Sequence, residues 1–447
     1  MIKIYDTMTR SLRDFVPLTE NVVNMYVCGP TVYNYIHIGN ARSAVAFDTI
    51  RRYFEYCGYT VNYISNFTDV DDKIIKAANE AGISTKELSD KFIAAFMEDT
   101  GQLGIKPATQ NPRVINYMDE IIAFVSTLVD KGFAYVSEGD VYFRVAKSNN
   151  YAKLANKTLE DLEIGASGRT DAETERKENP LDFALWKAAK EGEVSWDSPW
   201  GLGRPGWHIE CSVMATEILG DTIDIHGGGA DLEFPHHTNE IAQSEAKTGK
   251  TFANYWMHNG FVNVDNEKMS KSLGNFVTVH DMLKTVDGQV LRFFLATQQY
   301  RKPINFTEKA IHDAEVNLKY LKNTHSLPLT DQVNQDELQT YLEAFQEAMD
   351  DDFNTANGVT VLFDMAKWIN SGNYDQTVKD AFEKMLQVFG IVFEEEVLDE
   401  DIEKLIEERQ AARANKDFAT ADRIRDELAA QGIKLLDTKD GVRWTRD

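Results

Sequence analysis

The pattern of apolar and polar positions predicts alternating strands and helices in the first part of the chain. Residues 22–28 form a short apolar run that stops at a Gly-Pro pair, which is typical of a strand ending in a loop. Residues 37–58 carry apolar positions at helical spacing. Residues 60–72 predict a second strand with its loop, and 71–82 a second helix. This alternation favours a parallel α/β sheet.

The pattern becomes irregular and then resumes. Residues 115–205 are expected to be an insertion into the sheet domain, with a helix over 116–134 and a strand over 139–145. After it, 222–234 predicts a strand (IDIH) and a Gly-Gly-Gly loop, where a backbone can approach a ligand closely. A helix is expected at 236–246.

The next segment, 256–264, predicts one more strand, followed by the polar loop 266–275. From about residue 310 only helical periodicity remains. The acidic segment 394–408 is expected to be a connector or helix start. Beyond it we predict a helix at 418–431 and a hairpin around Asp440-Gly441.

Composition narrows the class of protein. The chain has 447 residues, 43% apolar and 27% charged, which is ordinary for a globular protein. With 47 basic and 72 acidic residues its net charge is −25, so any nucleic-acid site must be a local positive patch. Three cysteines exclude a disulfide scaffold and suit a reducing cytosol. The N-terminal segment does not read as a signal peptide, and no apolar run is long enough to predict a membrane span, so a cytoplasmic location is expected.

The HIGN segment (37–40) lies where the first strand leads into the first long helix. Unpaired N–H groups and the positive dipole end of a helix suit a phosphate. His37 can contribute a proton or a hydrogen bond there, and Gly39 lets a nucleotide ring lie on the backbone. The alternative is a helix start with a capping histidine. Four residues alone favour that alternative.

KMSKS (268–272) follows a strand in a polar loop. Lys268 and Lys271 can close on a polyphosphate and stabilise its developing charge. Alone, the segment reads as a solvated turn. Together with HIGN on one α/β chain it favours nucleotide chemistry.

Four other side chains form a candidate metal site. Two thiolates, one imidazole and one carboxylate would suit tetrahedral zinc. His236 and Glu240 are four residues apart and share a helix face. The pattern alone is weak, because the two cysteines are 183 residues apart and free cysteines usually pack as small apolar groups. His237 or His226 could equally supply the nitrogen. The candidate ligands are Cys28, Cys211, His236 and Glu240.

HIGN and KMSKS, in that order and about 230 residues apart, resemble the signature of class I aminoacyl-tRNA synthetases. Asn40 stands where that class usually has histidine, a departure common among its cysteine-specific members. Longer segments resemble the cysteinyl-tRNA synthetase family over the whole chain. They are YVCGPTVYNYIHIGN (26–40), NFTDVDDKI (66–74), GWHIECS (206–212), IHGGGADLEFPHHTNEIAQSEA (225–246) and HNGF with EKMSKSLGN (258–275).

The resemblance implies a ligase that activates L-cysteine with ATP and transfers it to tRNA(Cys), acting as a monomer. It implies one zinc per subunit, held by the four candidate ligands, and Mg²⁺ bound with ATP. ATP contacts are expected from His37, Gly39, Asn40, Lys268 and Lys271, and from Asp231, which could equally be a turn-forming residue. The amino-acid pocket is expected to include Gly29, Thr31, Thr68, Trp207 and His226, although Trp207 could instead be a core residue.

Zinc has a physical purpose in such a pocket. Serine differs from cysteine by one atom, and shape alone is worth only about 1–3 kcal/mol of discrimination. Zinc prefers a soft thiolate to a hydroxyl, so serine leaves a ligand position unfilled. No editing domain is then needed.

The tail differs in charge from the rest of the chain. Residues 409–447 hold nine basic and seven acidic residues. We expect tRNA contact from Arg425, Arg443 and Trp444, since arginines bind phosphate and an indole stacks on unpaired bases. The alternative is a small hairpin anchored by its tryptophan.

The expected domains follow the resemblance. A Rossmann-like catalytic domain is interrupted by a connective insertion and followed by a KMSKS and stem-contact region, a helical bundle and an anticodon-binding subdomain. The catalytic halves are expected at 1–114 and 206–255, and the insertion at 115–205. The KMSKS and stem-contact region is expected at 256–314, the helical bundle at 315–395 and the anticodon-binding subdomain at 396–447.

The sequence leaves two rival functions. One is a tRNA-independent cysteine ligase of mycothiol synthesis, whose family lacks the tail. The other is a non-catalytic RNA-binding paralogue, which has no need of both motifs and all four ligands.

Overall fold

The computed structural model describes residues 1–166, 174–394, 399–439 and 441–446. The chain forms two compact units, Met1–Val392 and Phe393–Asp447. None of the helices in the described ranges combines the length and the apolar run that crossing a bilayer requires.

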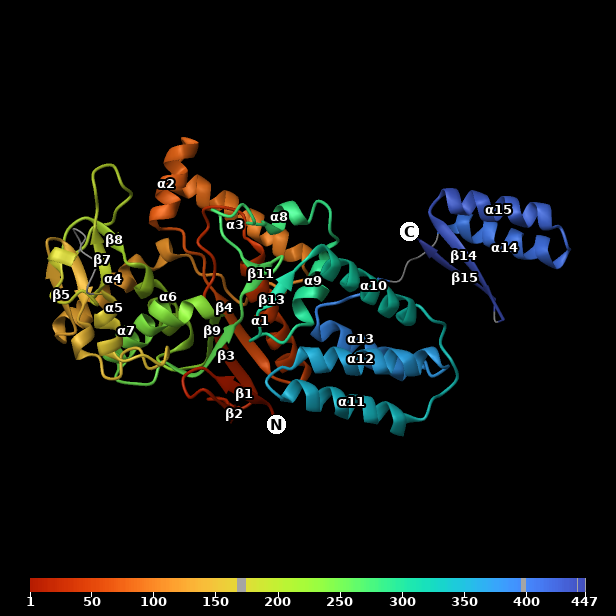
Figure 1. The fold of residues 1–447 in the computed structure, drawn as a ribbon, viewed down its shortest axis with the longest axis horizontal. Helices are drawn as coiled ribbons and strands as arrows, with labels where there is room; N and C mark the ends of the chain where they lie inside the picture. The colour runs from red at the N-terminus through yellow and green to blue at the C-terminus, as the bar shows by residue number, and fades with distance from the viewer. Residues whose placement is uncertain (167–173, 395–398, 440, 447) are drawn as a thin grey trace. The chain divides into compact units, whose positions relative to one another are not determined.

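A four-stranded parallel sheet lies at the centre of the first unit (Figure 1). All of its neighbouring strands run parallel, which confirms the predicted α/β class. The strand order is β10-β9-β3-β4, with β3 at Val22–Val27, β4 at Thr60–Ser65, β9 at Ile223–Gly229 and β10 at Ala253–Asn259. Helix α1 (Ile38–Tyr56) connects β3 to β4, α6 (Trp207–Leu219) precedes β9, and α7 (Thr238–Thr248) connects β9 to β10.

The glycine run at 227–229 is not a loop, contrary to the sequence-based expectation. Strand β9 continues through it, and Gly228 pairs with His258 of β10. A Cβ at Gly227 would lie 2.4 Å from the Phe47 ring of α1. Here the missing side chain lets a helix pack on the strand, so the glycine serves the core rather than a ligand.

The expected single strand over 256–264 is two strands in two sheets. Strand β10 ends at Asn259, and β11 (Val262–Val264) pairs with β13 (Ile304–Phe306) and β12 (Glu267–Lys268). Gly260 separates them, and a Cβ there would lie 2.5 Å from the backbone of Lys302. This close crossing redirects the chain toward the KMSKS loop.

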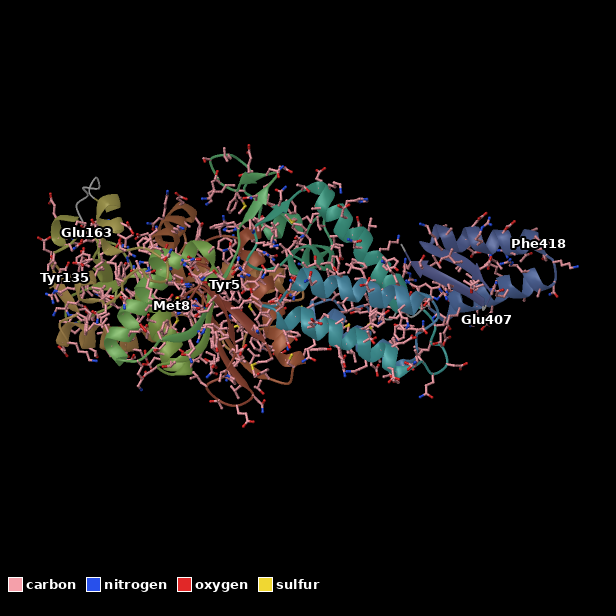
Figure 2. All side chains as sticks on the ribbon, turned by 60° about the horizontal axis from the view of Figure 1, so that its bottom comes forward. Tyr5, Met8, Tyr135, Glu163, Glu407 and Phe418 are labelled. Atoms are coloured by element: carbon pink, nitrogen blue, oxygen red, sulfur yellow. The ribbon has the colours of Figure 1, made fainter. Side chains whose placement is uncertain are left out.

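The inserted segment has a sheet of its own. Its strands are antiparallel in the order β5-β6-β7-β8, and α4 (Met118–Asp130) precedes them. They span Ala134–Ser137, Asp140–Phe143, Phe183–Ala188 and Gly203–Pro205, with α5 at Leu159–Ala166. Of these strands only β6 was predicted, as part of the expected strand over 139–145. Figure 2 labels Tyr135 on β5.

Helices follow the sheets, as the periodicity from about residue 310 predicts. They are α10 (Glu308–His325), α11 (Gln335–Asp350), α12 (Thr355–Asn370) and α13 (Gln376–Val388), while α9 (Gly288–Ala296) precedes β13. Each has a buried apolar stripe, for example Leu362, Met365 and Ile369 on α12. The remaining elements of the first unit are β1 (Lys3–Asp6), β2 (Ser11–Asp14), α2 (Asp72–Ala81), α3 (Thr85–Gln102) and α8 (Val279–Met282).

The second unit is a helical pair with a hairpin. Helices α14 (Glu400–Ala414) and α15 (Phe418–Ala430) precede the antiparallel strands β14 (Ile433–Thr438) and β15 (Gly441–Arg446). Ile402, Ile424, Leu428 and Ile433 form its core. Asp440 of the predicted turn lies outside the described residues.

Candidate functional site

Helix α1 begins with a reciprocal cap. The backbone N–H of Asn40 donates to His37 Nδ1 (3.2 Å), and the N–H of His37 donates to Asn40 Oδ1 (3.1 Å). A Cβ at Gly39 would lie 2.8 Å from the His37 ring, so glycine is required here. The ring therefore caps the helix, as the alternative interpretation held. Since Nδ1 accepts, a neutral ring carries its proton on Nε2.

His37 is neutral near pH 7. Burial, together with the charges of Lys271 and Lys73, lowers the pKa of His37 to about 4. The neutral ring can donate a hydrogen bond from Nε2–H to an anion although it carries no charge. The Nδ2 group of Asn40 has no protein partner in the described part of the chain, so it is a second available donor.

The segment that directly follows the KMSKS loop pairs with the start of α1. The N–H of Ile38 donates to Val277 O (3.1 Å), and His37 forms an isolated bridge with Thr278. The Lys271 ammonium lies 5.3 Å from the ring centroid of Phe276, which in turn packs edge-on against the His37 ring at 5.4 Å. Lys268 is exposed on β12. The structure thus places the two motifs, 230 residues apart in sequence, beside one another.

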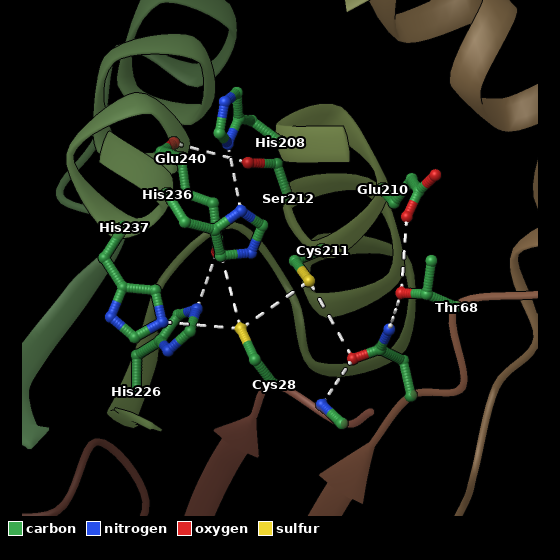
Figure 3. A network of polar contacts seen from close by, with 12 residues as sticks. Cys28, Thr68, His208, Glu210, Cys211, Ser212, His226, His236, His237 and Glu240 are labelled. Atoms are coloured by element: carbon green, nitrogen blue, oxygen red, sulfur yellow. Dashed lines mark hydrogen bonds and ion pairs between the residues drawn. The ribbon is translucent and has the colours of Figure 1, made fainter. Parts of the chain in front are cut away.

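The four candidate metal ligands converge at the carboxyl end of the central sheet (Figure 3). Cys28 directly follows β3, and its Sγ lies 3.6 Å from Cys211 Sγ on α6 and 3.5 Å from Glu240 Oε1 on α7. His236 Nε2 lies 2.9 Å from Glu240 Oε1 and makes no hydrogen bond within the described residues. Two thiolates on tetrahedral zinc, with Zn–S of about 2.3 Å, lie about 3.8 Å apart, so the donor set fits zinc in kind and spacing.

The electrostatics of the cluster favour a bound cation. Burial alone would lower the pKa of His236, but Glu240 and Cys211 raise it to about 10. Burial opposes ionisation of Glu240, yet His226 and His236 lower its pKa to about 2. A hydrogen bond from Cys28 lowers the pKa of Cys211 to about 6, while burial raises that of Cys28. Glu240 and Cys211 thus keep negative charge in the buried site, which a bound cation would compensate once His236 gives up its proton.

The structure also gathers His226 and His237 at this site. Cys28, His226, His237 and Glu240 form a second group with metal-ligand spacing. His226 Nε2 already pairs with Glu240 Oε2 at 2.6 Å, and its ring stacks on Trp256 at 4.5 Å. His226 therefore orients the carboxylate from behind.

Contacts through Asn66 and His236 link the expected pocket residues to the cysteine cluster. The N–H of Gly29 donates to Asn66 Oδ1 (3.0 Å), and a Cβ at Gly29 would lie 1.6 Å from the Asn66 carbonyl. Thr31 bridges Thr68, whose buried hydroxyl donates to Glu210 (3.5 Å). Trp207 is 41% exposed and stacks on His236 at 4.2 Å, so it is not a core tryptophan.

Asp231 lies apart from these contacts. It is exposed on a single turn (Ala230–Leu232) that directly follows β9. Its position is at the carboxyl end of the sheet, where ligands of open α/β sheets bind.

Three polar residues of the site were not predicted. His208 Nδ1 lies 2.9 Å from His236 Nδ1, His258 Nε2 lies 2.8 Å from His237 Nδ1, and Glu210 is buried beside Thr68. The available signal was their position inside the quoted segments GWHIECS and HNGF. Spacing alone could not assign them a partner.

The three tail residues expected to contact tRNA differ in exposure and in their contacts with the rest of the second unit. Trp444 is half-buried and packs on the core of the second unit. Arg443 is exposed on β15, whereas Arg425 pairs with Asp422 and Asp426, each at 3.2 Å. Arg409 anchors the hairpin through two 2.9 Å hydrogen bonds to Asp437.

Comparisons with known proteins match this arrangement. Residues 14–316 match a family described as tRNA synthetases class I (C) catalytic domain. Residues 344–394 match a DALR domain and 395–444 a cysteinyl-tRNA ligase anticodon binding domain. The fold and the paired motifs thus define a class I aminoacyl-tRNA synthetase.

Full-length relatives specify the family. Cysteine–tRNA ligases of Streptococcus thermophilus and Streptococcus agalactiae are 94% and 82% identical, and each alignment covers all of both chains. This chain belongs to the cysteine–tRNA ligase family, which confirms the resemblance. A Mycobacterium tuberculosis methionyl-tRNA synthetase in complex with methionyl-adenylate shares the fold, with a TM-score of 0.60 and 15% identity over 82% of this chain and 89% of that one.

Proposed function

We propose that this chain, as a cysteine–tRNA ligase, selects L-cysteine through a zinc ion held by Cys28, Cys211, His236 and Glu240. The observation that carries the proposal is their convergence, with Cys28 Sγ and Cys211 Sγ 3.6 Å apart at the carboxyl end of the sheet. When bound there, zinc supplies a soft Lewis acid that prefers a thiolate to an alkyl hydroxyl.

The chain's own residues would position the remaining atoms. A carboxylate oxygen of cysteine attacks the α-phosphorus of ATP, the α–β phosphoanhydride bond breaks, and pyrophosphate leaves. His37 Nε2–H and Asn40 Nδ2 would donate to phosphate oxygens, and Lys268 and Lys271 would balance the charge that develops on the leaving group. Mg²⁺ would enter with ATP.

The nucleoside and the amino acid would bind on either side of this reacting centre. Asp231 would accept hydrogen bonds from the ribose hydroxyls, and Gly39 would let the nucleotide ring approach the backbone. Trp207 would cover the amino-acid pocket beside His236, because it is partly exposed and stacks on that ring. Gly29, Thr31, Thr68 and His226 would line or support the same pocket.

The second step transfers the cysteinyl group to the terminal adenosine of tRNA(Cys), with AMP leaving. Arg425, Arg443 and Trp444 would contact the tRNA at the far end of the chain. We place the enzyme in the cytoplasm, where tRNA is charged for translation, and as a monomer. The domain division stated above, with an insertion at 115–205 and an anticodon subdomain at 396–447, remains part of the proposal.

Both rival functions are disfavoured. The match of residues 395–444 to an anticodon binding domain argues against a tRNA-independent ligase. The adjacency of His37 and the Lys271 loop argues against a non-catalytic paralogue, because an RNA-binding module has no need of that arrangement.

Metal analysis tests the proposal. Wild type is expected to contain one zinc per chain and to catalyse cysteine-dependent ATP–pyrophosphate exchange at least 10⁴-fold better than serine-dependent exchange. Cys211→Ser should lose both zinc and exchange, whereas Cys57→Ser, remote from the cluster, should lose neither. Active wild-type enzyme without metal, or equal use of serine, would contradict the proposal.

A further inference from the structure

A chain of buried polar groups leads from the N-terminal hairpin to the Cys28 sulfur. Thr7 Oγ1 lies 2.7 Å from His258 Nδ1, and His258 Nε2 lies 2.8 Å from His237 Nδ1. The other ring nitrogen of His237, Nε2, lies 3.4 Å from Cys28 Sγ (Figure 3). Thr7, His258 and His237 are 5%, 6% and 0% exposed, so each contact is shielded from water.

We define the relay as Thr7, His258 and His237, which come from three separate segments of the chain. Thr7 directly follows β1, and its N–H donates to Trp256 O (2.9 Å), which holds it against β10. His258 lies on β10 and pairs with Gly228 of β9. A Cβ at Gly228 would lie 3.0 Å from His237 Cε1, so the absence of a side chain there admits the His237 ring.

The acceptor at the end of the relay decides its direction. A thiolate accepts hydrogen bonds and donates none. When zinc is bound, Cys28 is a thiolate, so His237 must carry its proton on Nε2, and its Nδ1 must accept from His258 Nε2–H. His258 Nδ1 then accepts from the hydroxyl of Thr7. Glu233 Oε1 lies 4.0 Å from His258 Nδ1, which is too long to compete as a partner.

We propose that the relay holds His237 as an N–H donor to the Cys28 thiolate and thereby tunes the metal site for the substrate sulfur. The inference rests on the proposed function, since it concerns that site. An N–H···S bond withdraws electron density from the Cys28 sulfur, so Cys28 donates less to a bound cation. The cation is then more electron-poor and binds an incoming thiolate more tightly. His237 is a positioning residue in this account, and so are His258 and Thr7.

Substitution of cobalt for zinc allows the hydrogen bond from His237 to Cys28 to be detected spectroscopically. Co²⁺ replaces zinc in thiolate sites and shows a sulfur-to-metal charge-transfer band whose energy falls when the sulfur loses a hydrogen bond. His237→Leu is expected to shift this band to lower energy and to raise the KM for cysteine about tenfold at equal metal content, with the KM for ATP unchanged. His237→Gln, whose Nε2 can donate from a similar place, should restore the band and most of the KM.

A distant substitution separates the relay from local packing. Thr7→Val removes only the hydroxyl of a residue that contacts no ligand, and it should shift the band in the same direction by a smaller amount. Thr100→Val is the matched control, because Thr100 is also 5% exposed and its hydroxyl bonds only to its own helix. Its spectrum should equal that of wild type. Thermal unfolding of each variant shows that it is folded.

Two outcomes overturn the relay without touching the zinc proposal. One is a His237→Leu protein that binds cobalt with the wild-type band. The other is a His237→Gln protein as defective as His237→Leu, which would show that ring shape and not donation matters. A wild-type enzyme that is active yet binds neither zinc nor cobalt would instead overturn the proposed function.

Discussion

His37 and Asn40 cap each other at the start of α1, with each side chain accepting from the backbone N–H of the other. The histidine therefore has a structural task and a chemical one at the same time. Its Nδ1 is occupied by the cap, so only Nε2–H faces a ligand. The asparagine that replaces the usual histidine of the motif keeps the cap closed while its Nδ2 remains available.

Substitution of Asn40 separates these two tasks. Asn40→Ala leaves the His37 N–H without its acceptor and should lower the free energy of unfolding by about 1 kcal/mol. Asn40→Asp keeps an acceptor, so its stability in urea should stay near wild type while the KM for ATP rises, since a carboxylate repels phosphate. Equal stability of the alanine and wild-type proteins would contradict the capping role.

Lys271 should matter for activation and not for folding. Its ammonium lies near the His37 ring, where the charge of pyrophosphate would develop. Lys271→Ala is expected to slow ATP–pyrophosphate exchange about 10²- to 10³-fold, with the KM for cysteine little changed. Lys284→Ala is the control, because Lys284 follows the same loop but pairs with Asp281. Comparable losses in both variants would refute the assignment.

The stability of the metal-free protein should fall with acid. The folded-state pKa of His37 is lowered to about 4 and that of His258 to about 3, from 6.5 in the unfolded chain. Between pH 6.5 and 4 the unfolded chain therefore binds protons that the folded chain does not, so the free energy of unfolding decreases as the pH falls. His37→Asn keeps a capping oxygen and removes one titrating group. Urea unfolding at pH 7 and 5 should show a smaller decrease for this variant, and an unchanged decrease would exclude His37 as a contributor.

Among the tail arginines, Arg443 should affect tRNA charging more than Arg425. Arg443 is exposed and makes no ion pair among the described residues, whereas Arg425 is already paired with two aspartates. Arg443→Ala should raise the KM for tRNA roughly tenfold, equivalent to about 1.4 kcal/mol, with exchange activity unchanged. A larger effect from Arg425→Ala, or loss of exchange in either variant, would count against this division.

Trp444 is a less selective probe of tRNA contact. Its ring packs on the core of the second unit, so Trp444→Ala should lower the melting temperature of that unit and raise the KM for tRNA together. Differential scanning calorimetry beside charging assays would show both effects. A raised KM without destabilisation would mean that the indole contacts RNA and contributes nothing to the fold.

Local patterns in the sequence predicted much of this fold. Strand β3, helix α1 and strand β4 follow from apolar runs and glycine stops, because such periodicity reflects the burial of one face. Two expectations were wrong for a common reason. Gly227 was expected in a loop and Gly260 inside a strand, but each accommodates a neighbour from elsewhere in the chain, namely the Phe47 ring and the Lys302 backbone. A glycine in sequence does not tell which distant group requires its space.

The sequence by itself determined the family, the two nucleotide motifs and the residue types of a metal site, since these depend on chemical identity and on spacing along the chain. Only the tertiary structure decided which position each histidine takes at the metal site. His236 lies with the sulfurs, His226 lies behind Glu240, and His237 reaches Cys28 with His258 and Thr7 behind it. These assignments depend on ring orientation between β9, β10 and α7, which is set by packing among segments up to about 250 residues apart.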